Sequence, residues 1–323
     1  MITMKPQHQE IAGSLLKKLI YFDIFDYPLM PIEVIKYCNY SGLTLEKGVE
    51  VLDELLHDNI INFECGYYYL GSDKNKIKRR IDGNLLANKK MKPAENYSAL
   101  ISKFPFVRAV FISGSLSKNF MKPDSDIDFF IIVEPGKLWL CRALLTLYKK
   151  VFLLNSRKNF CLNYFVDTNS LTIPDKNVFT ATEIAFLKPM YNYSLYEKFL
   201  EANNWIRFEF PNMEFQANTI NIKQGRFQKF LEFIFDNKLG EQLEKISFSI
   251  ILSFWRRKFK DMSPKRFSLN LRSQHNVSKH HPNGFQERVL RSYSQKISQF
   301  SQHIDFQPPL NVETSILNSE YAN

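Results

Sequence analysis

The sequence predicts a protein of the mixed α+β class, and three observations predict it. Residues 8–70 show three runs of helical spacing followed by two short β-rich runs. Residues 107–166 hold three strongly apolar, strand-like runs, with one helical run between the last two. Residues 226–300 return to helical spacing. A chain of 323 residues is long enough for two or three domains with substantial cores.

The composition is that of an ordinary globular protein, with 45% hydrophobic and 24% charged residues. It excludes a collagen-like chain, a disordered tail protein and a disulfide miniprotein. The four cysteines, at positions 38, 65, 141 and 161, form no CxxC pair. We therefore expect reduced core thiols in a cytoplasmic protein rather than a zinc knuckle. The polar first ten residues predict no signal peptide, and the run Ile246–Trp255 is too short to span a bilayer.

The net charge of +10 is distributed unevenly along the chain. Residues 1–90 are balanced, residues 91–221 carry +3, and residues 222–323 carry +7. A partner that bears phosphate groups, such as RNA, is therefore expected mainly at the C-terminal end.

The N-terminal residues 1–75 are predicted to form one domain of three helices and a β-hairpin. Thr44 is a plausible N-cap for the third helix, and Cys65 with Gly66 forms the predicted hairpin turn. This order of elements is typical of a winged helix-turn-helix. The expected helices are 8–26, Pro31–Tyr37 and Leu45–Asp58, and the expected strands are Ile60–Glu64 and Tyr67–Leu70.

The charges on the third predicted helix argue against DNA binding by this domain. In a winged helix this element enters the major groove, where it lies between phosphates. Here it carries five acidic residues against the single Lys47, so phosphates would repel it. We expect a structural or protein-contact role, with a DNA-binding regulator as a disfavoured alternative. The basic run Lys74–Arg80 is interpreted as a solvated helix face.

The middle of the chain contains the residues with the most specific chemical pattern. The predicted strand Val107–Ser113 is followed by Gly114 and Ser115, which suit close approach of the backbone to a phosphate. Asp126 and Asp128 then open a second apolar strand. Residues two apart on a strand point to the same face, so both carboxylates should project together. Paired carboxylates beside a phosphate cradle are suited to hard divalent cations.

This stretch resembles the DNA polymerase β-type nucleotidyltransferase superfamily, in particular its minimal members. Their motif is Gly-Ser, ten residues, then Asp-x-Asp at the start of a hydrophobic strand, and Gly114-Ser115 and Asp126-Ile127-Asp128 fit it without a gap. The preceding Pro123-Asp124-Ser125 also looks like the family. Two positions depart from it, because many minimal members have arginine at Leu116 and glycine at Asn119. Asparagine tolerates positive φ, so the turn can survive.

The resemblance implies a nucleotidyltransferase-fold mixed sheet over residues 91–215 and a metal-dependent reaction. Asp126 and Asp128 would hold Mg²⁺ or Mn²⁺. Gly114, Ser115, Ser117 and Lys118 would bind the triphosphate of an NTP, with Lys118 or Lys122 replacing the missing arginine. The implied reaction moves a nucleoside monophosphate from the NTP to an acceptor that the sequence does not identify. The alternative is a catalytically degenerate nucleotide-binding or protein-interaction module with the same fold.

The third acid of the family is expected on the next strand, and here two residues compete for its place. Helical spacing predicts a crossover helix over Lys137–Leu154, followed by the strand Phe160–Val166. Asn163 lies in mid-strand and Asp167 at the strand end, on the same face by alternation. Asp167 is the candidate catalytic acid, and Asn163 is the alternative, which would leave the third carboxylate missing. Glu183, in the predicted helix Thr180–Leu187, is interpreted as an ordinary exposed residue.

Residues 216–304 are predicted to be a helical C-terminal region, with a loosely held tail over 305–323. Arg226–Phe254 should form one or two amphipathic helices with a break near Gly240, and Phe285–Phe300 a last helix. A basic cluster follows at Arg256–Lys258 and Lys260. It is interpreted as a solvated helix end, with a phosphate or RNA contact and attachment to a membrane surface as alternatives.

Overall fold

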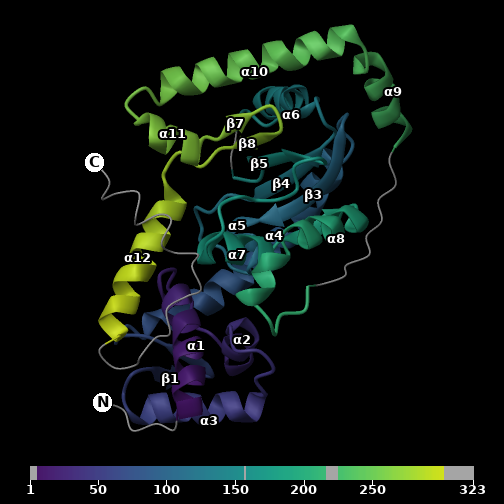
Figure 1. The fold of residues 1–323 in the computed structure, drawn as a ribbon. Helices are drawn as coiled ribbons and strands as arrows, with labels where there is room; N and C mark the ends of the chain where they lie inside the picture. The colour runs from purple at the N-terminus through teal and green to yellow at the C-terminus, as the bar shows by residue number, and fades with distance from the viewer. Residues whose placement is uncertain (1–5, 156–157, 216–224, 302–323) are drawn as a thin grey trace.

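The computed structural model describes residues 6–155, 158–215 and 225–301 of the chain. It is an α+β structure, as predicted, with a mixed six-stranded sheet, a separate two-stranded hairpin and many helices (Figure 1). The expected tail over 305–323 lies outside the described residues.

The N-terminal elements follow in the predicted order. They are α1 (Pro6–Asp23), α2 (Pro31–Tyr37), α3 (Leu45–His57), β1 (Asn62–Glu64) and β2 (Tyr67–Tyr69). Thr44 caps α3, because its side chain accepts a hydrogen bond from the Lys47 N–H. Cys65 and Gly66 have φ values of 51° and 83°, as a two-residue hairpin turn requires. The interpretation of these elements as a winged helix stays a prediction.

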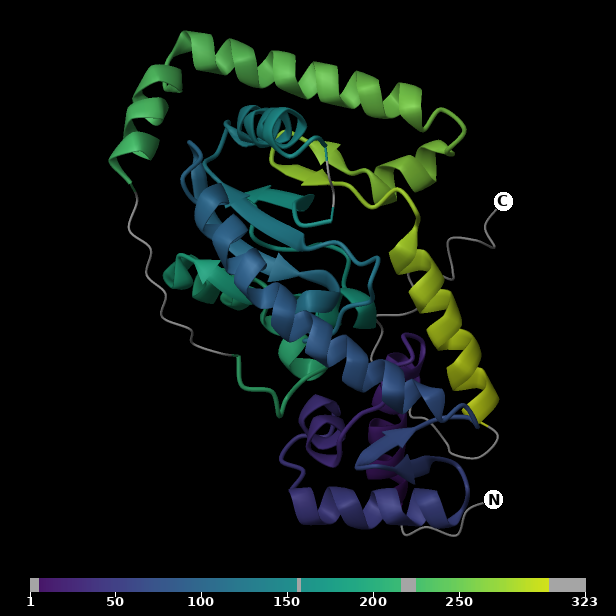
Figure 2. The same ribbon diagram turned by 180° about the vertical axis from the view of Figure 1, so that it is seen from behind.

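The sequence predicts a short helix over residues 94–104 and a solvated helix face over Lys74–Arg80, whereas the structure has one long helix, α4 (Asn75–Ile101), in which Arg80 is buried. Pro93 lies within this helix, which is why the sequence suggested a helix start at residue 94. Its buried positions include Gly83, Ala87 and Ala94, so small residues rather than a stripe of large apolar ones face the sheet. Figure 2 shows α4 crossing the back of the sheet from the N-terminal elements.

The sheet has the strand order β6-β3-β4-β5-β8-β7. Only β4 and β5 are parallel neighbours, and α6 (Leu138–Phe152) is the crossover helix between them, as predicted. Sequence reasoning missed β6, β7 and β8, because strands of two to four residues carry almost no periodicity. The strands are β3 (Val107–Ser113), β4 (Asp128–Val133), β5 (Cys161–Asp167), β6 (Lys188–Tyr191), β7 (Ser273–Gln274) and β8 (Val277–Lys279).

Helices cover both faces of the sheet. Val110 and Ile112 on β3 share a core with α4, α6 and α10 (Lys238–Lys258). The alternate residue Phe111 points to the other core, beneath α7 (Val178–Ala185), α8 (Tyr193–Ala202) and the short helix η1 (Asn204–Phe208). Large apolar residues at successive positions of β3 therefore reflect burial on both sides.

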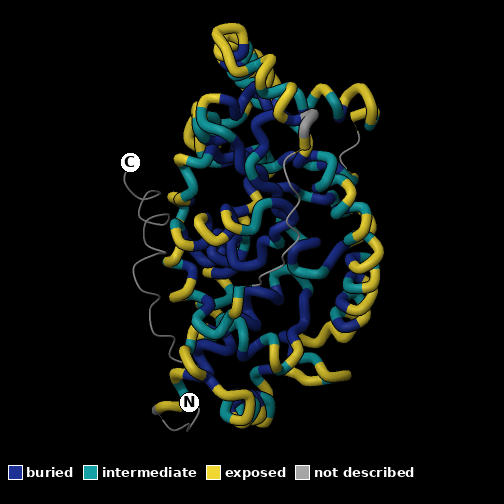
Figure 3. Tube along the Cα trace, turned by 90° about the vertical axis from the view of Figure 1, so that its right-hand side faces the viewer, coloured by how far each residue is buried: buried dark blue, intermediate teal, exposed yellow. Residues whose placement is uncertain are grey.

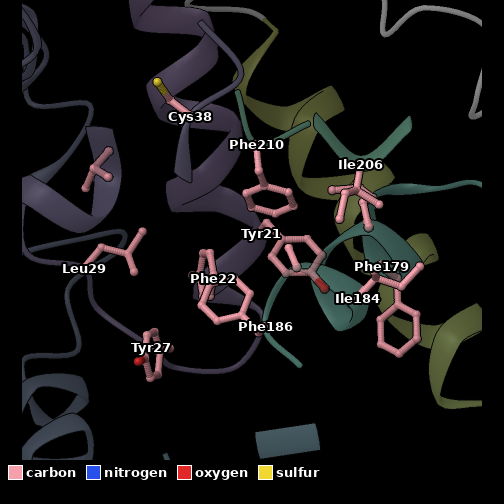
Figure 4. Packing of buried hydrophobic residues seen from close by; sticks show 14 of the residues in the cluster. Tyr21, Phe22, Tyr27, Leu29, Cys38, Phe179, Ile184, Phe186, Ile206 and Phe210 are labelled. Atoms are coloured by element: carbon pink, nitrogen blue, oxygen red, sulfur yellow. The ribbon is translucent and has the colours of Figure 1, made fainter. Parts of the chain in front are cut away.

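The N-terminal helices belong to the second of these cores. Phe22 of α1 contacts the rings of Tyr37 and Phe186, and Phe186 in turn contacts Phe210 (Figure 4). Buried residues from α1 to β2 and from the sheet thus form one continuous apolar cluster. The N-terminal elements are packed onto the sheet domain through α7 rather than joined to it only by the chain.

The C-terminal part begins with α9 (Arg226–Phe235), and α10 lies across the molecule above α6 (Figure 1). The break falls at Asp236 and Asn237 rather than near Gly240. The Asn237 side chain caps α10 by accepting from the N–H groups of Leu239 and Gly240 at 2.9 and 3.2 Å. After α10 come α11 (Pro264–Asn270) and α12 (Phe285–Phe300).

Within the described residues, none of the helices combines the length and the apolar character needed to cross a membrane.

Candidate active site

The register of the sheet brings the Gly-Ser turn and the Asp-x-Asp motif together. Ser113, the last residue of β3, pairs with Asp128, the first residue of β4. Gly114 follows with φ +67°, and a Cβ on it would overlap Oδ2 of Asp128. Only glycine allows the backbone to lie this close to the carboxylate. The two motifs therefore form one site, as the sequence predicted they would.

A single helical turn, α5 (Gly114–Ser117), shapes the loop after β3. The hydroxyl of Ser117 and the ammonium of Lys118 both donate to the carbonyl oxygen of Gly114, at 2.8 and 3.0 Å. Asn119 then adopts φ 56°, so it takes the left-handed conformation that glycine has in related turns. The turn therefore forms although Asn119 stands where the motif has glycine.

Negative charge accumulates around Asp128. Burial is the main cause that raises the pKa of its carboxyl from 3.8 to about 7. The charges of Asp126 and Glu183 act in the same direction, against the hydrogen bond from Cys161 and the charge of Lys118. Three carboxylates thus share a site with one lysine, which favours the binding of a further cation.

Glu183 is part of this site, so its interpretation as an ordinary exposed residue was wrong. Its Oε1 forms an ion pair with Lys118 Nζ at 2.8 Å. Lys118 therefore connects α7 to the loop after β3, since it also contacts the Gly114 carbonyl. The sequence carried no signal for this pair, because 65 residues separate the two side chains.

Asn163, and not Asp167, lies beside the paired acids. Phe129 pairs with Leu162 and Phe130 with Tyr164, so Asn163 is the extra residue of a β-bulge. The amide Nδ2 of Asn163 donates to Asp128 Oδ1 at 2.5 Å, and Cys161 Sγ lies 3.1 Å from Asn163 Oδ1.

Asp167 lies at the other end of β5, where it pairs with Val133. Val133 is five positions from Asp128 on β4, which corresponds to about 17 Å along the strand. The Asp167 carboxylate accepts a hydrogen bond from the Asn169 N–H at 3.0 Å, as in an Asx-turn. The structure therefore does not bring this predicted catalytic residue to Asp126 and Asp128.

The N-terminal elements and α4 support the loop after β3 directly, and sequence reasoning missed these contacts. The hydroxyl of Tyr27 donates to the carbonyl oxygen of Lys118 at 2.8 Å. The side-chain amide of Asn84 donates to the carbonyl oxygen of Asn119. Arg80 stacks on Tyr27, with its guanidinium 3.6 Å from the ring centroid, and pairs with Glu33.

The oxygen donors at this site fit a hard divalent cation. Asp126 and Asp128 supply carboxylate oxygens next to the Gly114 cradle, and a cation would neutralise the charges of Asp126 and Glu183 that, after burial, also raise the pKa of Asp128. Asn163 adds an amide instead of a third acid, which lowers the negative charge available for binding.

A different group in the described residues, His8, Glu50 and Glu54, also has the spacing of a metal site. It joins α1 to α3, within the N-terminal elements. The ammonium of Lys47 contacts His8 Nε2 at 2.5 Å and Glu50 at 2.8 Å, so a side-chain cation already offsets part of the negative charge of this group.

A cavity of about 650 Å³ lies between α10, α11 and the loop before α7. Its lining includes the cations Lys176, Arg256, Lys265 and Arg272, and the carboxylate of Asp175. Asp175 already pairs with Arg272 at 2.8 Å and with Lys279 at 3.4 Å. The cavity is therefore positively charged overall. Its lining includes Ser273 and Gln274 of the edge strand β7, which β8 separates from β5, the strand that carries Asn163.

Comparison with known proteins agrees with the site. No curated protein and no solved structure matches the chain. Residues 98–169 match the family model of the nucleotidyltransferase domain, a segment that runs from the end of α4 to just beyond β5. This segment contains Gly114, Ser115, Asp126 and Asp128, so the match and the geometry support the same assignment. The central part of the chain is thus similar in sequence to the nucleotidyltransferase domain, and its mixed α+β structure fits that fold.

Proposed function

We propose that the protein is a metal-dependent nucleotidyltransferase that moves a nucleoside monophosphate from an NTP to an acceptor. The observation that carries this proposal is the packing of Gly114 against Asp128. This packing places a turn of the phosphate-binding type directly beside the paired carboxylates, so that both lie in one negatively charged site. Neither part alone would specify nucleotidyl transfer, whereas the two together suit a metal–triphosphate complex.

Each residue has a distinct task in this proposal. Asp126 and Asp128 hold Mg²⁺ or Mn²⁺, which supplies charge neutralisation for the triphosphate and the leaving pyrophosphate. Gly114 and Ser115 present backbone N–H groups to the phosphates at the start of α5. Ser117 and Lys118 keep the turn in shape through the Gly114 carbonyl, and Lys118 contributes positive charge beside the phosphates.

Thermal unfolding with and without metal tests the site. Mg²⁺ or Mn²⁺ is expected to raise the Tm of the native protein, and an NTP is expected to add to the shift. The double variant Asp126→Asn with Asp128→Asn removes both carboxylates and should show no metal-dependent shift. Asp124→Asn is the matched control, since this exposed acid lies in the same loop but outside the site. A shift that persists in the double variant places the metal elsewhere and contradicts the proposal.

A non-catalytic nucleotide-binding protein is the second candidate, and Asn163 is the observation that favours it. An amide cannot accept the proton of an attacking hydroxyl, so the position beside Asp128 offers no additional base. Mg²⁺-dependent release of pyrophosphate from an NTP, measured with cellular extract as the source of acceptors, separates the two functions. A metal- and NTP-dependent Tm shift without pyrophosphate release favours the binding protein.

We also propose that the basic cavity beside α11 receives a phosphate group of the acceptor, including an RNA acceptor. Its cations exceed its single carboxylate, and a volume of about 650 Å³ suits a ligand of nucleotide size. The double variant Arg256→Gln with Lys265→Gln should weaken binding of a short RNA and reduce its salt dependence. If RNA binding is unchanged in this variant, the cavity does not bind the acceptor and the proposal is wrong.

A further inference from the structure

The helices α9 and α10 present large apolar side chains to solvent in an unusual concentration. Phe233 is 81% exposed, Ile250 63% and Phe254 58%. The exposed set on these two helices also includes Phe230, Ile234, Leu239 and Ile246. Isolated exposed apolar residues are normal, but a continuous patch of this kind marks an interaction surface.

The patch follows the outer side of α10. Ile246, Ile250 and Phe254 recur every four residues, so they form one stripe along the helix. The opposite side faces the protein, where Glu244 accepts from backbone N–H groups of α6 and Trp255 is buried. Figures 1 and 2 show α10 at the edge of the molecule, where no other helix or strand of the described residues lies above it, and Figure 3 shows this end largely exposed.

The charge pattern on this helix is equally unusual. Residues 246–255, ISFSIILSFW, contain no charged residue although much of their outer surface meets solvent. A surface helix in a soluble protein normally carries charges on its solvent side. Here the exposed cations Lys238, Lys245 and Arg257 border the stripe instead. Glu241 is the exposed carboxylate on the same helix.

We propose that the outer face of α10 binds in the plane of an anionic membrane surface. An apolar stripe flanked by lysine and arginine is the pattern of an interfacial amphipathic helix. The helix α10 has 21 residues and is about 31 Å long, and because its inner side is packed on α6 it lies flat along the surface instead of crossing it. The apolar side chains enter the boundary of the acyl chains while Lys238, Lys245 and Arg257 meet lipid phosphates.

The charge of the rim favours a lipid surface over a second copy of this chain. Two copies that met through this face would bring rims of the same positive sign together, and like charges across an interface repel. An anionic bilayer instead attracts every one of these cations. This inference is independent of nucleotidyl transfer, because no residue of the face belongs to the candidate active site.

Vesicle flotation of the full-length protein tests the proposal. The protein is expected to float with vesicles of phosphatidylcholine and phosphatidylglycerol at 7:3, to bind pure phosphatidylcholine vesicles far less, and to dissociate as salt rises. The triple variant Ile246→Ser, Ile250→Ser and Phe254→Ser should reduce the bound fraction at least tenfold. Lys238→Gln, Lys245→Gln and Arg257→Gln together should remove the preference for anionic lipid.

The matched control removes equally exposed apolar side chains from the N-terminal part and from α4, as Ile32→Ser, Phe63→Ser and Leu85→Ser. This control should float like the native protein, and circular dichroism should show that all variants are folded. Two results overturn the proposal. One is a native protein that stays with the unbound fraction for both vesicle types. The other is a dimer in light scattering that the Ile246, Ile250 and Phe254 changes abolish, with vesicle binding unaffected.

Discussion

Asn163 determines the chemistry of the candidate site more than any other single residue. Its amide donates to Asp128 and its carbonyl oxygen lies near the Cys161 thiol, so the side chain is held in one orientation. In the proposed metal site it would place a neutral donor where a third carboxylate would share the metal. Such a site should hold divalent cations less tightly than one with three acids.

The variant Asn163→Asp should strengthen metal binding, because it adds a carboxylate next to Asp128. We expect the concentration of Mn²⁺ at half-maximal Tm shift to fall about tenfold, corresponding to roughly 1.4 kcal/mol. Without metal the variant should be less stable than the native protein, since two carboxylates then face each other. Asp167→Asn is the control and should leave the Mn²⁺ titration unchanged. A change in the Mn²⁺ titration caused by Asp167→Asn, and not by Asn163→Asp, would instead mean that Asp167 binds the metal.

Asp128 also predicts a pH dependence of stability in the metal-free protein. Its pKa is about 7 when folded and near 3.8 when unfolded, so the folded state retains the proton over this interval. The native protein therefore loses stability as the pH rises from about 4 to 7, by about 4 kcal/mol in total. The Asp128→Asn variant should show no such loss of stability, because asparagine does not titrate.

Thermal unfolding in a chelating buffer measures this difference. The Tm advantage of Asp128→Asn over the native protein should grow between pH 4 and 7 and stay constant above pH 7. An advantage that is independent of pH would mean that the Asp128 carboxyl titrates normally in the folded protein.

Sequence reasoning could place Gly114, Ser115, Asp126 and Asp128 near one another, because the strand–turn–strand pattern is local in sequence, and their roles stay a prediction. It could not decide between Asn163 and Asp167. Strict alternation put both on one face, and a bulge of one residue changes that alternation. Glu183 and Tyr27 were missed for a different reason, because only the packing of distant elements brings them to the loop after β3.

At the scale of elements, Glu244 is the main polar connection between α10 and α6. Both of its carboxylate oxygens accept N–H groups at the start of α6, from Trp139 at 2.9 Å and from Leu140 at 2.6 Å. Those N–H groups have no partner within their own helix, so an acid from another element caps it. The capping residue Glu244 is 105 residues away from Trp139 in the sequence.

Glu244→Ala should lower the free energy of unfolding by about 2–4 kcal/mol, because two buried N–H groups lose their acceptor. Glu241→Ala, one turn earlier on the exposed side of α10, should change it by less than about 0.5 kcal/mol. Urea denaturation of both variants checks this pair. Equal effects of the two changes would show that α10 is not anchored through Glu244.

Elements with large apolar residues at regular spacing were predictable, and α2, α6 and α12 lie close to their expected positions. Helix α4 was not predictable as a whole, because glycine and alanine at its buried positions give no apolar stripe and Pro93 suggests a boundary. The edge strands β6, β7 and β8 are too short to show alternation. Their formation depends on the central strands that they pair with.

For the whole molecule, the continuous core between α1 and α7 implies cooperative unfolding. Phe22 contacts both Tyr37 of the N-terminal elements and Phe186 beside α7, so its loss affects both sides. Phe22→Ala should cost about 3–5 kcal/mol and lower a single calorimetric transition of the full chain. Two transitions, with only one lowered by the variant, would mean that the N-terminal elements unfold separately.

Gly83 allows α4 to pack closely against the turn that follows β3. Its carbonyl oxygen accepts the Met121 N–H, and a Cβ in its place would collide with the ring of Phe120. Phe120 and Met121 directly continue the turn that contains Lys118. A methyl group added at Gly83 would therefore force α4 and this turn apart. The composition of a helix on the back of the sheet therefore limits how the loop after β3 can vary.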